Sequence, residues 1–76
     1  MNEKDERIQT LKEKAKYFFV NNIEVHIPKV NGLFSRGYII KVEDSQIILK
    51  ERKEGTIPVY FLEMIDILKC IKEEEK

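Results

Sequence analysis

The apolar positions in the first part of the chain repeat with helical spacing. Apolar side chains recur at intervals of three and four residues with charged residues between them, and the set is Ile8, Leu11, Ala15, Phe18 and Phe19. Asn21 and Asn22 follow, and asparagine tolerates the left-handed conformation with which many helices end. The pattern predicts an amphipathic helix over about residues 3–20 that packs on one end of the structure that follows.

From residue 23 onward the apolar period changes to two, which is typical of strands with one buried face. Polar turns separate five such segments, and the predicted strands cover about residues 23–28, 33–43, 46–52, 56–61 and 64–71. Asn31-Gly32, between the first two segments, is a dipeptide that tight hairpin turns strongly prefer. Gly37 lies inside the second strand, where a glycine usually marks a sharp bend or a bulge. We expect the charged tail over residues 72–76 to fray.

The segment Thr56-Ile71 is apolar with little alternation, which predicts strands that are buried on both faces. A chain of 76 residues has only one interior. The second apolar face and the free strand edge therefore predict pairing with another copy, head to tail, in a ring that closes. Four apolar residues of this segment also fit a helical spacing, which leaves a single buried helix over about residues 61–74 as the alternative.

The small size of the chain makes its own core marginal, since a single domain of 76 residues buries only about 60% of its unfolded surface. Cys70 is the only cysteine, which excludes an intrachain disulfide. Cys70 and the single histidine His26 are too few for a structural zinc site, which needs four ligands. Association with other copies remains as the stabilising device. The sequence shows no apolar leader and no long apolar run, which predicts a cytoplasmic protein with no membrane span.

The charges of the sequence balance, with 14 Lys and Arg against 14 Asp and Glu. A net charge of +0 argues against a dominant phosphate-binding surface, although local basic patches remain compatible with it. No nucleophile–base pair, phosphate-binding loop or metal-ligand motif is present, so we expect no enzyme activity, no catalytic residues, no metal and no cofactor. We interpret His26 as a surface residue and Cys70 as an inert buried thiol.

The segment Val30–Glu43 is similar to the first motif of the Sm-like family, which includes bacterial Hfq and the archaeal and eukaryotic Sm proteins. It holds a turn glycine at Gly32, a second glycine five residues later at Gly37, alternating apolar positions and a following acid. The segments that resemble the family's third strand, second motif and last strand are Ile47–Lys50, Val59–Tyr60 and Ile67–Leu68. The resemblance covers about residues 23–70, and the family also has a helix before its strands.

This resemblance implies a mostly β domain over residues 1–76 with an N-terminal α-helix, a barrel over about residues 23–71 and a charged tail. The barrel that the resemblance implies is small, strongly bent and five-stranded, of the Sm-like (SH3-like) type. Because the family pairs its fourth and fifth strands between neighbours, the resemblance also implies a homo-hexamer or homo-heptamer joined through Thr56-Ile71. It further implies binding of single-stranded RNA, by base stacking of about 1–3 kcal/mol per base, in an RNA chaperone or adaptor.

The resemblance assigns RNA contacts to two groups of residues. The candidates around the pore are Tyr60, Phe61 and Gln46, and those on the opposite face are Asn31, Gly32, Leu33 and Arg36. The sequence departs from the family where Ser45 replaces a stacking side chain, where Phe61 and Leu62 replace the basic Lys-His pair of Hfq, and where Pro28 replaces an aromatic. Packing alternatives stay open: Tyr60 at the subunit interface, Phe61 in the core or interface, and Arg36 as a solvated strand residue.

Three functional hypotheses follow from these observations. The first is a ring that binds single-stranded RNA as chaperone or adaptor. The second is a structural or protein-interaction module of the same fold that binds no RNA, which the zero net charge and the apolar Leu62 favour. The third is a monomeric SH3-like barrel, of the KOW or chromatin type, that recognises a peptide or a ribosomal partner. The mass in solution separates the third hypothesis from the first two, and RNA binding separates the first from the second.

Overall fold

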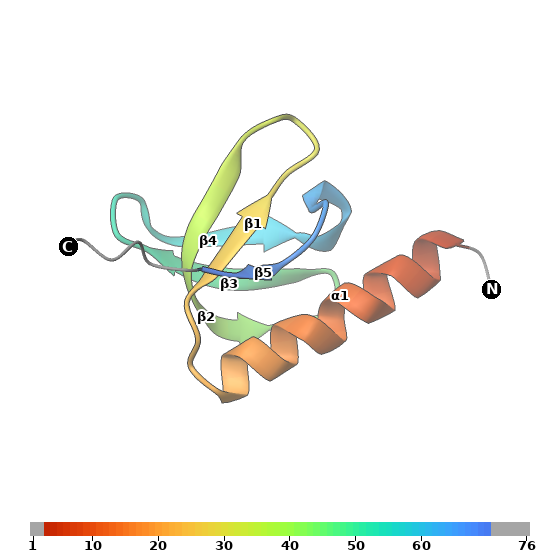
Figure 1. The fold of residues 1–76 in the computed structure, drawn as a ribbon, viewed down its shortest axis with the longest axis horizontal. Coiled ribbons are helices and arrows are strands. Elements are labelled where there is room, and N and C mark those ends of the chain that lie inside the picture. The colour runs from red at the N-terminus through yellow and green to blue at the C-terminus, as the bar shows by residue number, and fades with distance from the viewer. Residues whose placement is uncertain (1–2, 71–76) are drawn as a thin grey trace.

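The computed structural model describes residues 3–70, which form one helix followed by a five-stranded antiparallel sheet (Figure 1). The elements are α1 (Glu3–Val20), β1 (Val25–Pro28), β2 (Phe34–Val42), β3 (Gln46–Glu51), β4 (Gly55–Tyr60), η1 (Phe61–Glu63) and β5 (Leu68–Lys69). The predicted helix and five strands are therefore confirmed. The alternative of one helix over residues 61–74 is wrong within the described residues, because only the short 3-10 turn η1 lies between β4 and β5. The tail over residues 72–76 lies outside the described part.

Helix α1 ends at the two asparagines. Asn22 has a left-handed φ of 55°, a conformation that asparagine adopts more readily than most side chains. The backbone N–H of Asn21 donates to the carbonyl of Tyr17 at 3.1 Å, and that of Ile23 donates to the carbonyl of Phe18 at 3.0 Å. These bonds satisfy carbonyls that the last helical turn leaves without partners, so the helix stops where the asparagine pair predicts.

The turn between β1 and β2 has the geometry that its sequence predicts. Gly32 adopts a φ of 89°, which an L side chain rarely adopts. The side-chain oxygen of Asn31 accepts a hydrogen bond from the Leu33 N–H at 2.9 Å. The hairpin is closed by the Lys29 N–H, which donates to the Leu33 carbonyl at 2.8 Å. Gly55 has the same function in the β3–β4 turn, with a φ of 78°.

Gly37 does not mark the bulge in β2. The pairing of β2 with β3 shifts between Ile39 and Lys41, two residues or more beyond the glycine, so the extra residue is Ile40. At Gly37 the two strands instead approach so closely that a Cβ atom would lie 2.2 Å from the carbonyl oxygen of Lys50. The interpretation of this glycine as a bulge is therefore wrong. The interpretation as a bend is not contradicted, because β2 pairs with β1 up to Gly37 and with β3 from Tyr38 onward.

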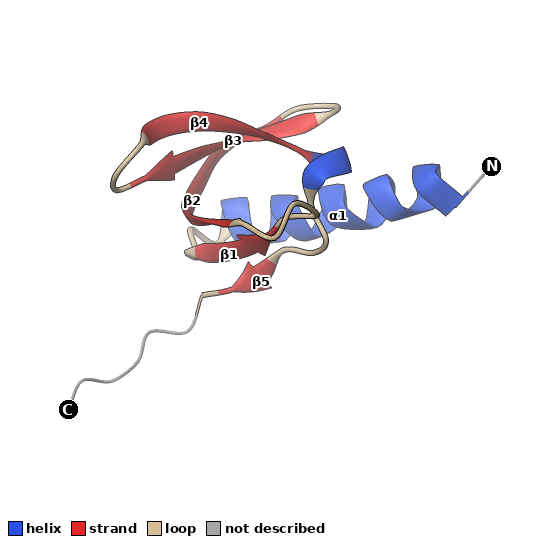
Figure 2. Cartoon of the chain, turned by 90° about the horizontal axis from the view of Figure 1, so that it is seen from above, coloured by secondary structure: helices blue, strands red, loops and turns tan. Residues whose placement is uncertain are grey.

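The sheet is strongly bent and open. Its strand order is β4-β3-β2-β1-β5, and Figure 2 shows β2 passing from the layer of β3 and β4 to the layer of β1 and β5. Strands β4 and β5 are the two edges, and no hydrogen-bonded pairing joins them within the described residues. The predicted barrel is therefore not closed by hydrogen bonds in the single chain.

The last strand is shorter than the sequence predicts. Only Leu68–Lys69 pair with β1, whereas the apolar pattern predicts a strand over residues 64–71. The residues before β5 attach to the β1–β2 hairpin instead, because the Ile65 N–H donates to the Pro28 carbonyl at 2.8 Å. Residues 64 and 65, at the start of the predicted strand, thus pair with the β1–β2 hairpin and do not form a continuous strand with Leu68–Lys69.

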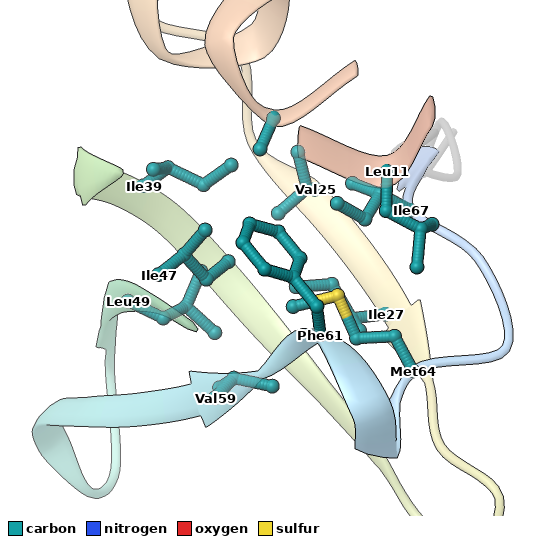
Figure 3. Close-up of a cluster of buried hydrophobic side chains, with 11 residues drawn as sticks. Leu11, Val25, Ile27, Ile39, Ile47, Leu49, Val59, Phe61, Met64 and Ile67 are labelled. Atoms are coloured by element: carbon teal, nitrogen blue, oxygen red, sulfur yellow. The ribbon is translucent and has the colours of Figure 1, made fainter. Parts of the chain in front are cut away.

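One apolar core lies between α1 and the inner face of the sheet (Figure 3). Its buried members are Leu11, Ala15, Val25, Ile27, Ile39, Ile47, Leu49, Val59, Phe61, Met64 and Ile67. Polar contacts at the rim hold the helix over the core: the Arg7 guanidinium donates to the Met64 carbonyl at 2.7 Å, and Lys14 pairs with Asp66 at 2.6 Å. Burial raises the pKa of Asp66, but the hydrogen bonds from Lys14 and from the Ile67 N–H outweigh it and lower that pKa.

Candidate nucleic-acid interface

The C-terminal segment contains both buried and exposed apolar side chains. Val59, Phe61, Met64 and Ile67 are buried, whereas four large apolar side chains of the same segment are exposed. These four, the C-terminal apolar row, are Tyr60 (47% exposed), Leu62 (62%), Ile65 (53%) and Leu68 (44%). The row lies along the elements that also hold the two unpaired sheet edges, β4 and β5. The segment that contains both unpaired edge strands therefore also carries exposed large apolar side chains.

Tyr60 and Gln46 face each other directly across β4 and β3. Directly opposed side chains have Cβ atoms about 5 Å apart, so a base stacked on the Tyr60 ring comes within reach of the Gln46 amide. The Gln46 amide N–H donates to the Glu43 carboxylate, which also pairs with the Lys41 ammonium at 3.3 Å. The hydrogen bond from Gln46, and after it the one from Lys41, lowers the pKa of Glu43. Glu43 thus binds the side-chain NH₂ group of Gln46. The side-chain oxygen of Gln46 has no hydrogen-bond partner among the described residues.

Phe61 does not belong to this surface. Its side chain is 1% exposed and lies in the middle of the core, pointing among the side chains of the sheet (Figure 3). Its backbone N–H donates to the Ser45 carbonyl at 3.0 Å, which fixes the start of η1. The assignment of Phe61 to RNA stacking is therefore wrong for this chain, because the ring is closed off from solvent; the packing alternative describes it.

The other four candidates lie at the β1–β2 hairpin. Asn31 and Gly32 shape the turn itself, and Leu33 is exposed beside them. Arg36 lies on the outward face of β2, directly across from His26 on β1. The structure thus groups these candidates at the β1–β2 side of the sheet, whereas Tyr60 and Gln46 lie on β4 and β3.

Two residues of this region carry an interaction that the sequence interpretation missed. The imidazole of His26 stacks on the ring of Phe34, with centroids 4.7 Å apart and planes inclined by 29°. Both residues lie at outward phases of neighbouring strands, where Pro28 pairs with Phe34 and His26 with Arg36. The alternation of β2 already placed Phe34 and Arg36 on one face; the register that brings His26 to them comes from the folded hairpin.

Two further classes of site find no support in the part of the chain that is described. Residues 3–70 contain no group of three or more His, Cys, Asp or Glu side chains arranged to hold a metal ion. Within the same residues, the one helix is not apolar enough over its length to span a bilayer. Cys70, predicted to be a buried thiol, is half-buried directly after β5, and its N–H donates to the Glu24 carbonyl at 2.9 Å.

Comparison with known proteins gives a match in structure but none in sequence. The sequence matches no family model, and no curated protein matches it at the significance required. The structure matches a 1.55 Å crystal structure of the pleiotropic translational regulator Hfq, with a TM-score of 0.67 and 20% sequence identity. The match covers 80% of this chain and 97% of that chain. This chain has the fold of Hfq.

The Hfq fold confirms the Sm-like architecture that the two-glycine segment predicts. At 20% identity the likeness concerns the path of the backbone, and the chemistry of the surface is this chain's own. That surface combines the Tyr60–Gln46 pair, the C-terminal apolar row and the hairpin cluster around Arg36. Each of the three faces solvent in the single chain, so each is available to a ligand or to another copy.

Proposed function

We propose that this protein forms a homo-oligomeric ring in the cytoplasm and binds single-stranded RNA as a chaperone or adaptor, without enzyme activity. The observation that carries the proposal is the fold, which covers 97% of the chain of a pleiotropic translational regulator. The surface features of this chain support each half of the proposal separately. The apolar row and the sheet edges support the ring, and the Tyr60–Gln46 pair supports RNA binding.

The ring follows from the two unpaired edges. An exposed strand edge with apolar neighbours is a template for pairing with another chain. Strand β4 ends one side of the sheet and β5 ends the other, so the β4 edge of one copy can pair with the β5 edge of the next. Such head-to-tail contacts generate a closed ring when the rotation permits. A hexamer or heptamer is the size we propose, with Ile65 and Leu68 of the C-terminal apolar row covered at each contact and Tyr60 left open to solvent.

RNA binding rests on stacking combined with a hydrogen-bonding group. Tyr60 offers a half-exposed ring, and Gln46 beside it offers an amide oxygen to the edge of a base. Stacking on one aromatic ring contributes about 1–3 kcal/mol and tolerates every base, whereas the amide selects bases that present a donor. Asn31, Gly32, Leu33 and Arg36 form the second contact region on the hairpin, with the Arg36 guanidinium suited to phosphate. Phe61 is not part of the proposed site.

Light scattering coupled to size exclusion tests the ring directly. We expect nuclease-treated protein in high salt to have the mass of a hexamer or heptamer, and Leu68→Lys to shift it toward the monomer because a charge enters the apolar row. Val20→Lys is the matched control, since Val20 is also exposed but lies at the end of α1. A wild-type monomer at high concentration contradicts the ring and favours the monomeric SH3-like module.

Fluorescence anisotropy with labelled adenylate and uridylate oligonucleotides tests the RNA half. We expect salt-sensitive binding that Tyr60→Ala weakens by about tenfold, equivalent to about 1.4 kcal/mol. Gln46→Leu should reduce discrimination between the two oligonucleotides more than it reduces affinity. A ring that binds neither oligonucleotide at low salt contradicts the RNA function. It then supports the second hypothesis, a protein-interaction module, which the exposed apolar Leu62 favours.

A further inference from the structure

The turn between β2 and β3 fixes the direction of the Gln46 amide. Gln46 is the first residue of β3, and its side-chain NH₂ group donates to a carboxylate oxygen of Glu43. A carboxylate only accepts hydrogen bonds, so the amide cannot turn its oxygen toward Glu43 without bringing two acceptors together. The amide oxygen is therefore left as the free end of the Gln46 side chain, with no hydrogen-bond partner among the described residues.

Glu43 is itself held by two further interactions. Its backbone N–H donates to the Gln46 carbonyl at 2.8 Å, which closes the turn, and its other carboxylate oxygen pairs with the Lys41 ammonium at 3.3 Å. The hydrogen bonds from Gln46 and then from Lys41 lower the pKa of Glu43, so its side chain is ionised at neutral pH. Glu43 thus keeps a negative charge and an acceptor beside the amide.

The fixed amide lies beside the ring on which a base is proposed to stack. Gln46 and the half-exposed Tyr60 are directly opposite partners of β3 and β4. The backbone N–H groups of Glu43 and Phe61 are already used, the latter by the Ser45 carbonyl at 3.0 Å. The edge of a base on the Tyr60 ring therefore meets the amide oxygen with a carboxylate close behind it, and neither of these backbone donors is free to compete.

An acceptor at this place distinguishes the RNA bases by their donors. Guanine presents two adjacent donors on its base-pairing edge, the N1–H and the 2-amino group, whereas uracil presents one N3–H between two carbonyl oxygens. Adenine and cytosine present an amino group beside a ring nitrogen that accepts. The Gln46 oxygen has two lone pairs and can accept from both donors of guanine, while the charge of Glu43 repels the carbonyl oxygens of uracil.

We infer that the Tyr60–Gln46 site selects guanine in single-stranded RNA, and that Glu43 is the positioning residue that sets this preference by holding the Gln46 amide. The guanine base stacks on Tyr60 and donates to the Gln46 oxygen. Glu43 acts through Gln46 and needs no contact of its own with the base. The inference rests on the proposed RNA function and adds a base identity to it, because stacking alone tolerates every base.

Wild-type protein tests the base preference without any substitution. Fluorescence anisotropy is measured with labelled uridylate oligonucleotides of about eight nucleotides, in which one central residue is uridine, guanosine, adenosine, cytidine or inosine. A single guanosine per strand avoids guanine quadruplexes. We expect the guanosine strand to bind about tenfold more tightly than the strand with uridine alone. Inosine keeps the N1–H but lacks the 2-amino group, so its strand should bind with an affinity between these two.

Two alanine substitutions in the same turn test the role of Glu43. Glu43→Ala frees the amide to present either its oxygen or its NH₂ group, so the ratio of guanosine to uridine affinity should fall to about twofold or less. Asp44→Ala is the matched control, because it removes the same charge from the next residue, whose carboxylate pairs with Lys12 and not with Gln46. It should keep the wild-type ratio. The ratio is the readout, since removal of either acid can raise the affinity for both strands.

The outcomes separate this inference from the proposed function. A guanosine preference that Glu43→Ala abolishes and Asp44→Ala keeps supports the inference. A preference that survives Glu43→Ala, or that Asp44→Ala abolishes as well, in folded protein of wild-type mass, overturns the role of Glu43. Equal affinity of wild type for the guanosine and uridine strands, together with weaker binding by Tyr60→Ala, overturns the guanine site and leaves the proposed RNA function standing. Absence of binding to every strand at low salt overturns both proposals together.

Discussion

Replacement of Phe61 separates the packing role of this ring from an RNA-binding role. The side chain is 1% exposed and fills the centre of the core. Truncation of a buried phenylalanine to alanine costs about 3–5 kcal/mol, from lost transfer energy and from the cavity that remains. The whole stability of a 76-residue domain is about 4–11 kcal/mol. We therefore expect Phe61→Ala to remove about a quarter or more of the free energy of unfolding.

The loss of unfolding free energy in Phe61→Ala corresponds to a large decrease in Tm. A chain of 76 residues gains about 160 cal/mol/K of entropy on unfolding near its midpoint. A loss of about 3 kcal/mol therefore lowers Tm by about 20 °C for Phe61→Ala. Phe61→Leu keeps most of the buried volume and should lose only about 1–2 kcal/mol. Urea and thermal unfolding should be measured at several protein concentrations, because a ring adds stability that depends on concentration.

Tyr60 provides the internal comparison for this experiment. It is adjacent in sequence but half-exposed, so Tyr60→Ala should change the unfolding free energy of the folded chain by less than about 1 kcal/mol while weakening RNA binding. Phe61→Ala should show the opposite, a large stability loss and unchanged affinity per folded molecule. The reasoning is refuted if Phe61→Ala unfolds like wild type within about 0.5 kcal/mol and binds RNA more weakly.

Three further substitutions test other features of the structure. Gly37→Ala should destabilise the fold by about 3 kcal/mol in urea titrations, because its Cβ would lie 2.2 Å from the Lys50 carbonyl oxygen. Asp66→Asn should remove about 1 kcal/mol or less of stability near neutral pH, since the ion pair with Lys14 is partly solvated. Because the pKa of Asp66 is lowered by folding, its contribution is present above about pH 4 and disappears as the pH falls through the folded pKa, so the two unfolding curves should converge in acid. Asn22→Val should lower stability by about 1–2 kcal/mol at the left-handed φ of 55°, whereas glycine there should not.

Two lysines of α1 form ion pairs with acids outside the helix. Lys12 pairs with Asp44 at 3.0 Å and Lys14 with Asp66 at 2.6 Å. Asp44 lies in the turn between β2 and β3 and Asp66 between η1 and β5, so both ion pairs fasten the helix to loops that flank the strands. Arg36 of β2 and Lys50 of β3 form no ion pair among the described residues, and both lie on the outward faces of their strands.

Local sequence determined the elements of this protein and their ends. The change of apolar period near residue 23 predicts a helix followed by strands, and backbone sterics at Asn22, Gly32 and Gly55 predict where the chain turns. These features depend on residues close in the chain, so a single sequence contains them. The Sm-like order of elements followed from the same local information, and the structural match to Hfq bears it out.

In the C-terminal segment, apolar and polar residues do not alternate regularly. There, only the tertiary structure decided which side chains face the core and which face solvent. Tyr60 and Phe61 are adjacent aromatics, and the 3-10 turn that begins at Phe61 sends one ring outward and the other into the core. The register of the hairpin brings His26 onto Phe34, although the two residues are eight positions apart in the sequence. Close approach of β2 to β3 explains Gly37, and no local pattern shows it. Such contacts join residues distant in the chain, and their geometry exists only once the sheet has bent around its core.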